Sequence, residues 1–308
     1  MIVTVTLNAA IDKTYYVNHL EKGRVTRADR VLAEPGGKGI NVARVIAQLG
    51  RPVLATGFAG GSNGEFIRRG LDKQGIRHDF VPVNGESRLC LNMMEADGSS
   101  TELLEPGPVI SDEEMSAFRA KLLKLAEEAN LFVFSGSLPA GVPKSFYAEL
   151  LTDIHQAGAK ALLDTSGEAL IRGIEAGPYA IKPNEEELAA IEGRSFETEA
   201  AILEAMRGLG NRTACIQVSR GSEGSLALYE GLAYRVKPPV IEAVNTVGCG
   251  DAYMAGTAIG LHEGLPYADI LRLATAAAAA NALNDRAGHV DAGVVEALRE
   301  QVQIEVIG

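Results

Sequence analysis

Residues 245–256 read Asn-Thr-Val-Gly-Cys-Gly-Asp-Ala-Tyr-Met-Ala-Gly, and this stretch says more about the fold than any other part of the chain. Gly248 and Gly250 can adopt backbone dihedral angles that are closed to other residues, so successive N–H groups can point into one concavity. The apolar residues that follow predict a helix, and the positive end of its dipole favours an anion there. The stretch therefore predicts a phosphate site at the N-terminus of a helix.

Asp251 stands inside this predicted anion site, where a carboxylate would repel a phosphate unless it served another purpose. One such purpose is to accept a proton from a hydroxyl that attacks a phosphoryl group. Such a carboxylate would be a weak base, because a helix N-terminus lowers the pKa of an aspartate. The alternative is that Asp251 only caps the helix. These residues alone leave both interpretations open.

Two further segments carry a family resemblance. Residues 35–44 read Pro-Gly-Gly-Lys-Gly-Ile-Asn-Val-Ala-Arg, and residues 182–188 read Lys-Pro-Asn-Glu-Glu-Glu-Leu. Together with residues 245–251 they resemble, in the same order, three signatures of the ribokinase-like (PfkB) carbohydrate kinases. Asn245 and Cys249 depart from the family's usual Asp-Thr-Val-Gly-Ala-Gly-Asp. The resemblance extends over nearly the whole chain and implies phosphoryl transfer from ATP with Mg²⁺.

Composition narrows the class of protein. A chain of 308 residues with 46% hydrophobic residues makes either two average domains or one large α/β domain with a small appendage. The formal net charge of −11 argues against a nucleic acid or an anionic membrane as partner. Its three cysteines are far apart in sequence, and the first seven residues read as a strand rather than a signal peptide. We therefore expect a cytoplasmic protein without disulfides.

Strand and helix patterns alternate along most of the chain. Strands are expected near residues 2–7, 53–58, 131–134, 161–163 and 179–182, and helices from residues 39, 63, 144 and 184. Such alternation predicts a parallel sheet with right-handed crossovers. Residues 15–34 and 88–105 interrupt it with β-rich segments, the second a hairpin around Asp97-Gly98. These two interruptions predict one small separate sheet.

The resemblance implies that this small sheet is a lid over a sugar site and a means of forming a homodimer. The expected fold is a ribokinase-like three-layer α/β/α core with a mainly parallel sheet, plus a small β-sheet lid. We expect a single kinase domain over residues 1–308, with the core formed by residues 1–10, 39–86 and 107–308 and the lid by residues 11–38 and 87–106.

Two other phosphate-binding patterns are excluded. Lys38 is followed by Gly39 rather than Ser or Thr, and Leu32 occupies the place of the first glycine of a P-loop. Tyr253 occupies the place of the third glycine of a dinucleotide fingerprint, and the glycines do not follow the first strand. A P-loop NTPase and a dehydrogenase are therefore disfavoured.

Phosphoryl transfer needs an oriented hydroxyl, a base and positive charge around the transferred group. Asp251 is the expected base, and the amides of Gly248, Cys249 and Gly250 are expected to hold the charge that develops on the phosphoryl oxygens. Removing one such donor typically costs ~3–4 kcal/mol of transition-state stabilisation.

The nucleotide side is expected around Asn184 and Glu187, which lie three residues apart on one helix face. The resemblance places both near the Mg²⁺–ATP phosphates, mostly through water. The alternative is a capping asparagine followed by a solvated acidic face. The resemblance further assigns to the nucleotide side Lys182, Ser219, Gly221, Gly224 and Asn281.

The sugar side is expected around Asp12 and Asn41, whose carboxylate and amide can form paired hydrogen bonds to vicinal hydroxyls. Gly36 and Gly37 belong to the same side, because glycine lets the backbone approach a sugar ring closely. The alternative for Asp12 is an ordinary turn residue. A phosphorylated sugar is suggested by Arg27, Lys38 and Arg88, because Arg forks and a Lys point charge hold phosphate well. Surface arginines need not converge, which is the competing interpretation. Ser137, in Ser-Gly-Ser-Leu-Pro, completes the expected substrate-binding set.

The expected activity is that of an ATP-dependent hexose-phosphate kinase. The Gly-Gly-Lys-Gly form of residues 36–39 resembles the 1-phosphofructokinase and tagatose-6-phosphate kinase branch, which makes fructose 1-phosphate the first choice of acceptor. Tagatose 6-phosphate and fructose 6-phosphate fit the same site, and a nucleoside or ribose kinase on the same fold is disfavoured by the basic cluster. The alternative from another class is a non-catalytic sugar-phosphate sensor.

Overall fold

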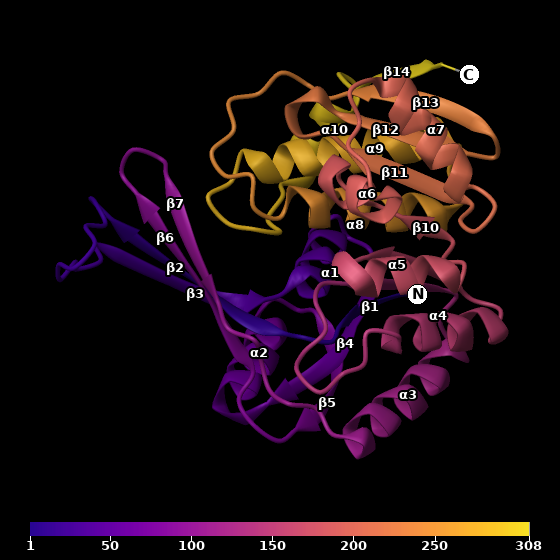
Figure 1. Ribbon diagram of the computed structural model, residues 1–308. Coiled ribbons are helices and arrows are strands. Elements are labelled where there is room, and N and C mark those ends of the chain that lie inside the picture. Colours follow the sequence, from indigo (N-terminus) through magenta and orange to yellow (C-terminus); the bar gives the residue numbers. More distant parts are fainter. Residues whose placement is uncertain (308) are drawn as a thin grey trace.

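The computed structural model describes residues 1–307, which form a large sheet between two layers of helices and a separate small sheet (Figure 1). The large sheet has the strand order β14-β13-β12-β11-β10-β9-β8-β1-β4-β5, and its strands from β5 to β11 run parallel. The small sheet has the order β3-β2-β6-β7. The predicted fold class is therefore confirmed.

The elements alternate along the chain as the sequence predicts. The strands of the large sheet are β1 (Ile2–Thr6), β4 (Val53–Gly60), β5 (Arg77–Val83), β8 (Leu131–Ser135), β9 (Lys160–Asp164), β10 (Ala180–Ile181), β11 (Cys215–Ser219), β12 (Ser225–Tyr229), β13 (Leu232–Lys237) and β14 (Gln303–Val306). The helices are α1 (Lys38–Gln48), α2 (Gly61–Lys73), α3 (Asp112–Ala126), α4 (Phe146–Gln156), α5 (Gly167–Glu175), α6 (Glu185–Glu192), α7 (Glu199–Leu209), α8 (Cys249–Glu263), α9 (Tyr267–Ala282) and α10 (Ala292–Arg299).

Strand β8 shows how the two helix layers bury the sheet. Its five residues, Leu-Phe-Val-Phe-Ser, are all buried. Leu131 and Val133 join the core beneath α1, α2, α8, α9 and α10, whereas Phe132 and Phe134 join the core beneath α3 to α7. Successive side chains of a strand point to opposite faces, so a strand covered on both sides reads as a continuous apolar run.

The C-terminal end of the sheet departs from parallel pairing. Strands β12, β13 and β14 add to β11 in antiparallel order, with Ser219 opposite Ser225 and Tyr234 opposite Val306. The sequence did not predict β14, because its alternating Gln-Ile-Glu-Val is short and follows directly after a helix.

The small sheet, here called the lid, consists of β2 (Ala10–Val17), β3 (Arg30–Gly36), β6 (Arg88–Glu95) and β7 (Ser100–Leu104). It extends from the body as an arm (Figure 1). The expected hairpin is present, and Gly98 at its turn has φ 88°, a conformation that favours glycine. At the base of the arm Ala10 pairs with both Gly36 and Arg88, which joins the two β-rich interruptions of the sequence.

The alanine-rich run of residues 274–282 predicts a helix whose small side chains permit close packing, and α9 does pack closely against α8. A Cβ atom added at Gly256 would lie 2.5 Å from the Cα atom of Ala274, so only glycine fits there. This contact fixes α8, and with it the position of the helix N-terminus that carries Asp251.

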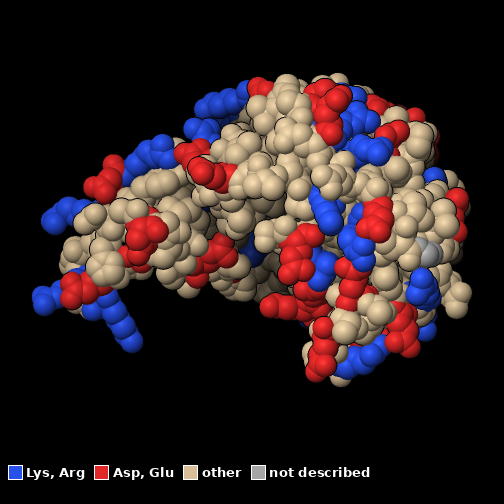
Figure 2. Space-filling model, turned by 90° about the horizontal axis from the view of Figure 1, so that it is seen from above, with Lys and Arg blue, Asp and Glu red and all other residues tan. Residues whose placement is uncertain are grey.

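The surface carries acidic and basic side chains interspersed over the face seen in Figure 2. No helix within residues 1–307 combines the length and the apolarity that a membrane span requires. Cys90, Cys215 and Cys249 all have free thiols.

Candidate active site

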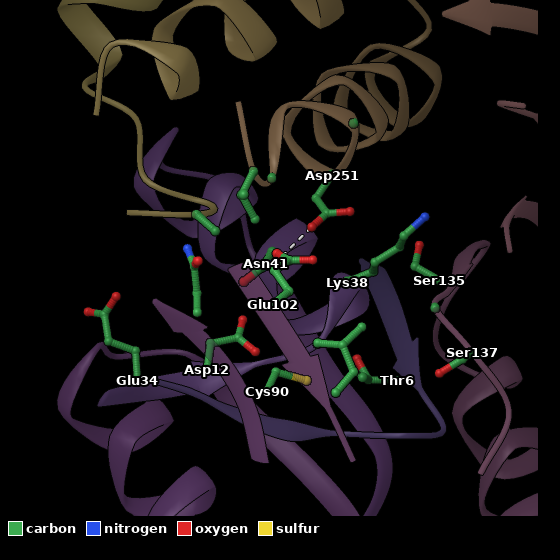
Figure 3. A pocket seen from close by; sticks show the side chains of 18 of the residues that line it. Thr6, Asp12, Glu34, Lys38, Asn41, Cys90, Glu102, Ser135, Ser137 and Asp251 are labelled. Carbon is green, nitrogen blue, oxygen red and sulfur yellow. Dashed lines mark hydrogen bonds between the residues drawn. The ribbon is translucent and has the colours of Figure 1, made fainter. Parts of the chain in front are cut away.

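A cavity of about 530 Å³ lies between the lid and the carboxyl ends of the core strands. Small-molecule sites typically fall in this size range. Figure 2 shows the surface hollowed between the arm and the body, and Figure 3 shows that both contribute side chains to the cavity. Asp12 and Arg88 come from the lid, whereas Lys182 and Asp251 come from the core. The cavity therefore joins the predicted sugar and phosphate sites.

Asp251 lies in the first turn of α8 and is only 5% exposed. Its Oδ2 atom accepts a hydrogen bond of 2.9 Å from Asn41 Nδ2, shown as a dashed line in Figure 3. The helix has Gly248 at its N-cap with φ 84°, and no side chain caps it. Capping by Asp251 is therefore the wrong interpretation, because this carboxylate bonds across to α1 and faces the cavity.

Burial raises the pKa of Asp251 to about 7, with Lys38, Asn41 and Lys182 opposing the rise and Asp164 adding to it. The sequence predicted a shift in the other direction, on the strength of the helix N-terminus alone. Desolvation outweighs the dipole because the carboxylate is enclosed. A base whose pKa is close to neutral is well matched to proton transfer near pH 7.

Two lysines share one buried carboxylate beside this base. Asp164 Oδ1 lies 3.3 Å from Lys38 Nζ and 3.6 Å from Lys182 Nζ. Burial tends to raise the pKa of Asp164, but the two ammonium groups hold it below its usual value. Asp164 in turn raises the pKa of Lys38 well above its usual range, against the effect of burial. Lys38 is therefore charged, and both lysines lie where an anion in the cavity can bind.

The sequence missed Asp164 as a site residue, although a signal was present. It is the last residue of β9, a buried strand, and polar residues at the carboxyl ends of parallel strands meet at one edge of the sheet. Its Oδ2 atom is buried without a hydrogen-bond partner among the described residues.

The expected sugar side contains Asp12 on β2, packed against the backbone of Gly36. A Cβ atom at Gly36 would lie 2.1 Å from Asp12 Cγ, so this glycine is required for the approach. Burial raises the pKa of Asp12, while Arg44, a backbone hydrogen bond from Gly37, and Arg88 oppose the rise. Figure 3 shows the Asp12 carboxylate directed into the cavity.

Several polar atoms of the cavity wall have no hydrogen-bond partner within residues 1–307. They are Thr6 Oγ1, Asn8 Oδ1, Asn92 Oδ1 and Ser135 Oγ. Buried polar groups are nearly always paired, so these four atoms are exceptions that gather in the wall of one cavity. Ser137, also in the wall, accepts a hydrogen bond of 3.3 Å from Asn8 Nδ2.

Only two of the three predicted phosphate-binding cations line the cavity. Arg88 donates to Asn8 O (3.2 Å) and Glu105 O (3.3 Å), which fixes its guanidinium and leaves Nη2 open. Lys38 is engaged with Asp164, on the side of Asp251. Arg27 is exposed on the connection between β2 and β3 and lies outside the cavity wall. The prediction that Arg27, Lys38 and Arg88 converge is therefore wrong within this chain.

Asn41, which was predicted to bind sugar, lines the cavity, and its amide also bonds to two protein groups. Its Nδ2 atom donates to Asp251, and its Oδ1 atom accepts a hydrogen bond of 2.8 Å from Arg44 Nη1. Arg44 was not predicted as a site residue, since a single arginine in a helix carries no signal of its own. Both side chains are buried.

Asn184 and Glu187 form a capping box at the start of α6. Asn184 Oδ1 accepts from the Glu187 amide (2.7 Å), and Glu187 Oε2 accepts from the Asn184 amide (2.9 Å). Both residues also line the cavity, so the capping interpretation holds without excluding the other one. No group of three or more His, Cys, Asp or Glu side chains in the described part of the chain forms a dedicated metal cage. One free oxygen on Glu187 suits a magnesium ion that keeps its waters.

Of the remaining residues predicted for the nucleotide side, some line the cavity and others do not. Ser219 lines the cavity, whereas Gly221 and Gly224 lie beyond its wall. A Cβ atom at Gly224 would lie 2.0 Å from Val236 O, so this glycine serves the β11–β12 turn. Asn281 is wholly buried: it donates to Val247 O (2.9 Å) and accepts from the Gly288 amide (2.7 Å). Asn281 thus supports the glycine loop and does not face a nucleotide.

Comparison with known proteins adds to this geometry. The model of the pfkB family carbohydrate kinases matches residues 5–290. Phosphofructokinase-2 from Escherichia coli, solved in complex with fructose-6-phosphate, is 27% identical, with a TM-score of 0.92 over 97% of this chain and 98% of that one. A putative phosphofructokinase from Staphylococcus aureus is 30% identical, with a TM-score of 0.85 over 100% and 99% of the two chains.

A possible 1-phosphofructokinase from Thermotoga maritima is 24% identical, with a TM-score of 0.91 over 100% of this chain and 99% of that one, and this likeness shows the fold alone. The family match covers most of the chain, including all three signatures and the buried Asp251. This chain therefore belongs to the pfkB family of carbohydrate kinases, which transfer a phosphoryl group to a sugar hydroxyl and for which kinase chemistry implies ATP as the donor.

Proposed function

We propose that this protein is an ATP-dependent kinase for a phosphorylated ketohexose, with fructose 1,6-bisphosphate as its product. The observation that carries the proposal is that one cavity holds a buried carboxylate beside two lysines and, on its lid side, a fixed arginine. A neutral sugar has no need of Arg88, whereas a phosphate already on the sugar is held well by a guanidinium.

The residues present can perform each part of the transfer. Asp251 would accept the proton as the sugar oxygen forms its bond to the γ-phosphorus, while the bond from that phosphorus to the ADP oxygen breaks and ADP leaves with the electron pair. The amides of Gly248, Cys249 and Gly250, with Lys38 and Lys182, would hold the negative charge on the transferred group. In a loose transition state the proton of the attacking hydroxyl leaves late, so a base of moderate strength suffices.

Mg²⁺ would neutralise charge on the ATP phosphates and is best placed at Asn184 and Glu187 through its waters. Both residues line the cavity beyond Lys182, at the start of α6. Their mutual hydrogen bonds hold them in place before any ligand arrives.

Two acceptors lead to the same product. Fructose in its furanose form has a CH₂–O arm at each end, so Arg88 can hold a phosphate on one arm while the hydroxyl of the other meets Asp251. The Gly-Gly-Lys-Gly form of residues 36–39 favours fructose 1-phosphate. The E. coli relative, which was solved in complex with fructose-6-phosphate, favours fructose 6-phosphate. Tagatose 6-phosphate is the third candidate.

The deciding experiment measures kcat/KM with Mg²⁺-ATP for fructose 1-phosphate, fructose 6-phosphate, tagatose 6-phosphate, fructose and ribose, with Asp251→Asn as the inactive control. A preference for fructose 1-phosphate or fructose 6-phosphate supports the proposal and names the acceptor, whereas a preference for tagatose 6-phosphate would keep the phosphohexose kinase and contradict the proposed product. Activity confined to fructose or ribose would contradict a phosphate-binding role for Arg88. Binding of a sugar phosphate without turnover would establish the sensor instead.

We also propose a homodimer formed through the lid. Strand register and alternation place Tyr15, Val31, Met93 and Leu103 on the face of the lid opposite to Asp12 and Glu102. Leu103 is 60% exposed and Val31 is 45% exposed. An apolar row on an extended arm is typical of a surface that pairs with another chain. A cytoplasmic location and the absence of nucleic-acid and membrane partners remain predictions from composition.

A further inference from the structure

We propose that Arg44 is a positioning residue for phosphoryl transfer: its buried guanidinium fixes the orientation of the Asn41 amide, which in turn holds the Asp251 carboxylate. The inference rests on the proposed function in taking Asp251 as the base. Arg44 itself lies one residue removed from the reacting groups, so it acts through Asn41 and not by touching a substrate.

The first observation is the number of acceptors around one enclosed side chain. Arg44 is 2% exposed, yet its Nε donates to Gln74 Oε1 (3.1 Å) and its Nη1 donates to Asn41 Oδ1 (2.8 Å) and Ala287 O (3.2 Å). Its Nη2 donates to Pro35 O. All four acceptors are neutral, and no carboxylate of residues 1–307 lies within ion-pair distance of this guanidinium. A buried charge of this kind is costly compared with an apolar residue of the same size, so stability alone does not account for it.

The second observation is chemical direction. A guanidinium has donors only, so the end of the Asn41 amide that faces Arg44 must be the oxygen. The NH₂ end then faces Asp251, where it donates to Oδ2. Without Arg44 the amide could turn over and present its oxygen to the carboxylate, which an ionised Asp251 would repel. Arg44 therefore decides which protonation state of Asp251 the amide favours.

The third observation is that Arg44 also holds the loop behind the glycine-rich stretch. Gly288 packs against it so closely that a Cβ atom there would lie 3.0 Å from Arg44 Nη1 and 2.9 Å from Asn41 Cβ. The Gly288 amide donates to Asn281, which donates to Val247 O just before the N-cap of α8. One guanidinium thus contacts both the amide that holds the base and the loop that supports the anion site.

The electrostatic surroundings of Asp251 set the form of the test. Lys38 from the start of α1 and Lys182 after β10 lower its pKa, and Asp164 at the end of β9 raises it. The positive charge of Arg44 acts in the same direction as the lysines, so removing that charge would shift the titration of Asp251 even without a positioning role. The informative variant is therefore Arg44→Lys, which keeps the charge but has no planar fork and ends one bond short of Nη1, so it cannot reach Asn41 Oδ1 while keeping its other acceptors.

The test titrates Asp251 in the ligand-free protein by ¹³C NMR, with Asp251→Asn identifying its signal. We expect Arg44→Lys to raise the pKa of Asp251 by about one unit, since a hydrogen bond to a charged group is worth that much. The same substitution placed in an Asn41→Ala background should add nothing, because both changes remove one interaction. Arg119→Lys, which alters an arginine paired with Asp153 between α3 and α4, is the matched control and should leave Asp251 unchanged.

A wild-type titration of Asp251 in Arg44→Lys would overturn the inference, and so would a shift that persists in the Asn41→Ala background. Gln74→Met provides a milder variant, because it removes the Nε acceptor at the end of Arg44 remote from Asp251. It should shift the same pKa in the same direction by a smaller amount, and an unchanged pKa in this variant counts against the inference should Arg44→Lys fail to fold. A wild-type protein that phosphorylates no sugar would end the proposed function, while the titration would still decide the role of Arg44.

Discussion

Gly250 lies directly against the ammonium group of Lys182: a Cβ atom at position 250 would stand 3.1 Å from Lys182 Nζ. The backbone of the anion site and one of its two lysines are thus so close that a side chain at position 250 would have to displace the lysine. Because the lysine is the end of a flexible chain, a methyl group at position 250 would displace it and leave the helix intact.

We therefore expect Gly250→Ala to reduce kcat by about 10- to 100-fold, as removal of a charge-stabilising group in an anion hole does. Steady-state assays and thermal unfolding would measure the effect. Gly208→Ala in α7 is the control, because that position has open space and an ordinary backbone, so the change should leave kcat unaltered and stabilise the helix slightly. A Gly250→Ala enzyme with wild-type kcat would show that Lys182 plays no part in transfer.

Asp251→Asn should lower kcat by about 10²- to 10⁴-fold with little change in the KM for ATP, because the base is lost and the backbone amides remain. For the wild type, kcat/KM should rise with pH through about 7, since the carboxylate acts as a base only when ionised. Rate measurements between pH 5.5 and 9 on the phosphohexose test this, with pH values chosen on either side of that pKa. Retained turnover in Asp251→Asn would assign the proton to another acceptor.

The same residue links stability to pH. The pKa of Asp251 rises from 3.8 in the unfolded chain to about 7 in the folded protein, so the folded state binds the extra proton and loses stability as the pH rises between these values. The loss amounts to roughly 4 kcal/mol. Asp251→Asn should therefore raise Tm above pH 7 and change it little near pH 4. An equal change in Tm at both pH values would mean that folding does not raise the pKa of the Asp251 carboxylate.

Arg88→Ala should raise the KM for the phosphorylated sugar about 10- to 100-fold, the usual worth of a hydrogen bond to a charged group, while the KM for ATP stays constant. Arg27→Ala is the matched control, because Arg27 is exposed and lies outside the cavity wall of its own chain. An equal loss for unphosphorylated fructose would show that Arg88 supports the lid rather than binding phosphate. A large effect of Arg27→Ala would place that arginine in a site to which this single chain does not bring it.

Leu103→Glu should convert the proposed dimer to a monomer, because a charge in an apolar interface is left without a partner. Light scattering at several protein concentrations measures the mass. Val109→Glu, at a position that is 71% exposed and outside the lid, controls for a general effect of the added charge. A wild-type chain that is already monomeric would exclude the interface, whatever the variant does.

The sequence was informative wherever the chemistry lies in consecutive residues. Gly248, Gly250 and Asp251 are neighbours in the chain, and the structure builds a helix N-terminus from them. The alternation of strands and helices, the lid hairpin and the small residues between α8 and α9 could be predicted for the same reason, because each depends on local periodicity or turn geometry.

The remainder depends on how distant elements meet. Whether Asn41 faces a sugar or Asp251 is decided by the crossing of α1 and α8, which no local pattern encodes. The direction of the Asp251 shift depends on enclosure by Lys38, Asp164 and Lys182, three residues from three elements. Arg27 was grouped with Lys38 and Arg88 because such side chains hold phosphate well, but Arg27 lies on an exposed connection outside the cavity wall.

The four strands of the arm pair only with one another, in a sheet separate from the large one. Asp12 and Arg88 belong to the arm, whereas Lys182, Asp164 and Asp251 belong to the body. If Asp12 and Arg88 bind the acceptor as proposed, acceptor recognition and transfer chemistry are encoded in different parts of the chain. Substitutions within two short segments can retune which sugar is admitted while the machinery of transfer is inherited unchanged, which makes the arm the natural target for engineering a new acceptor.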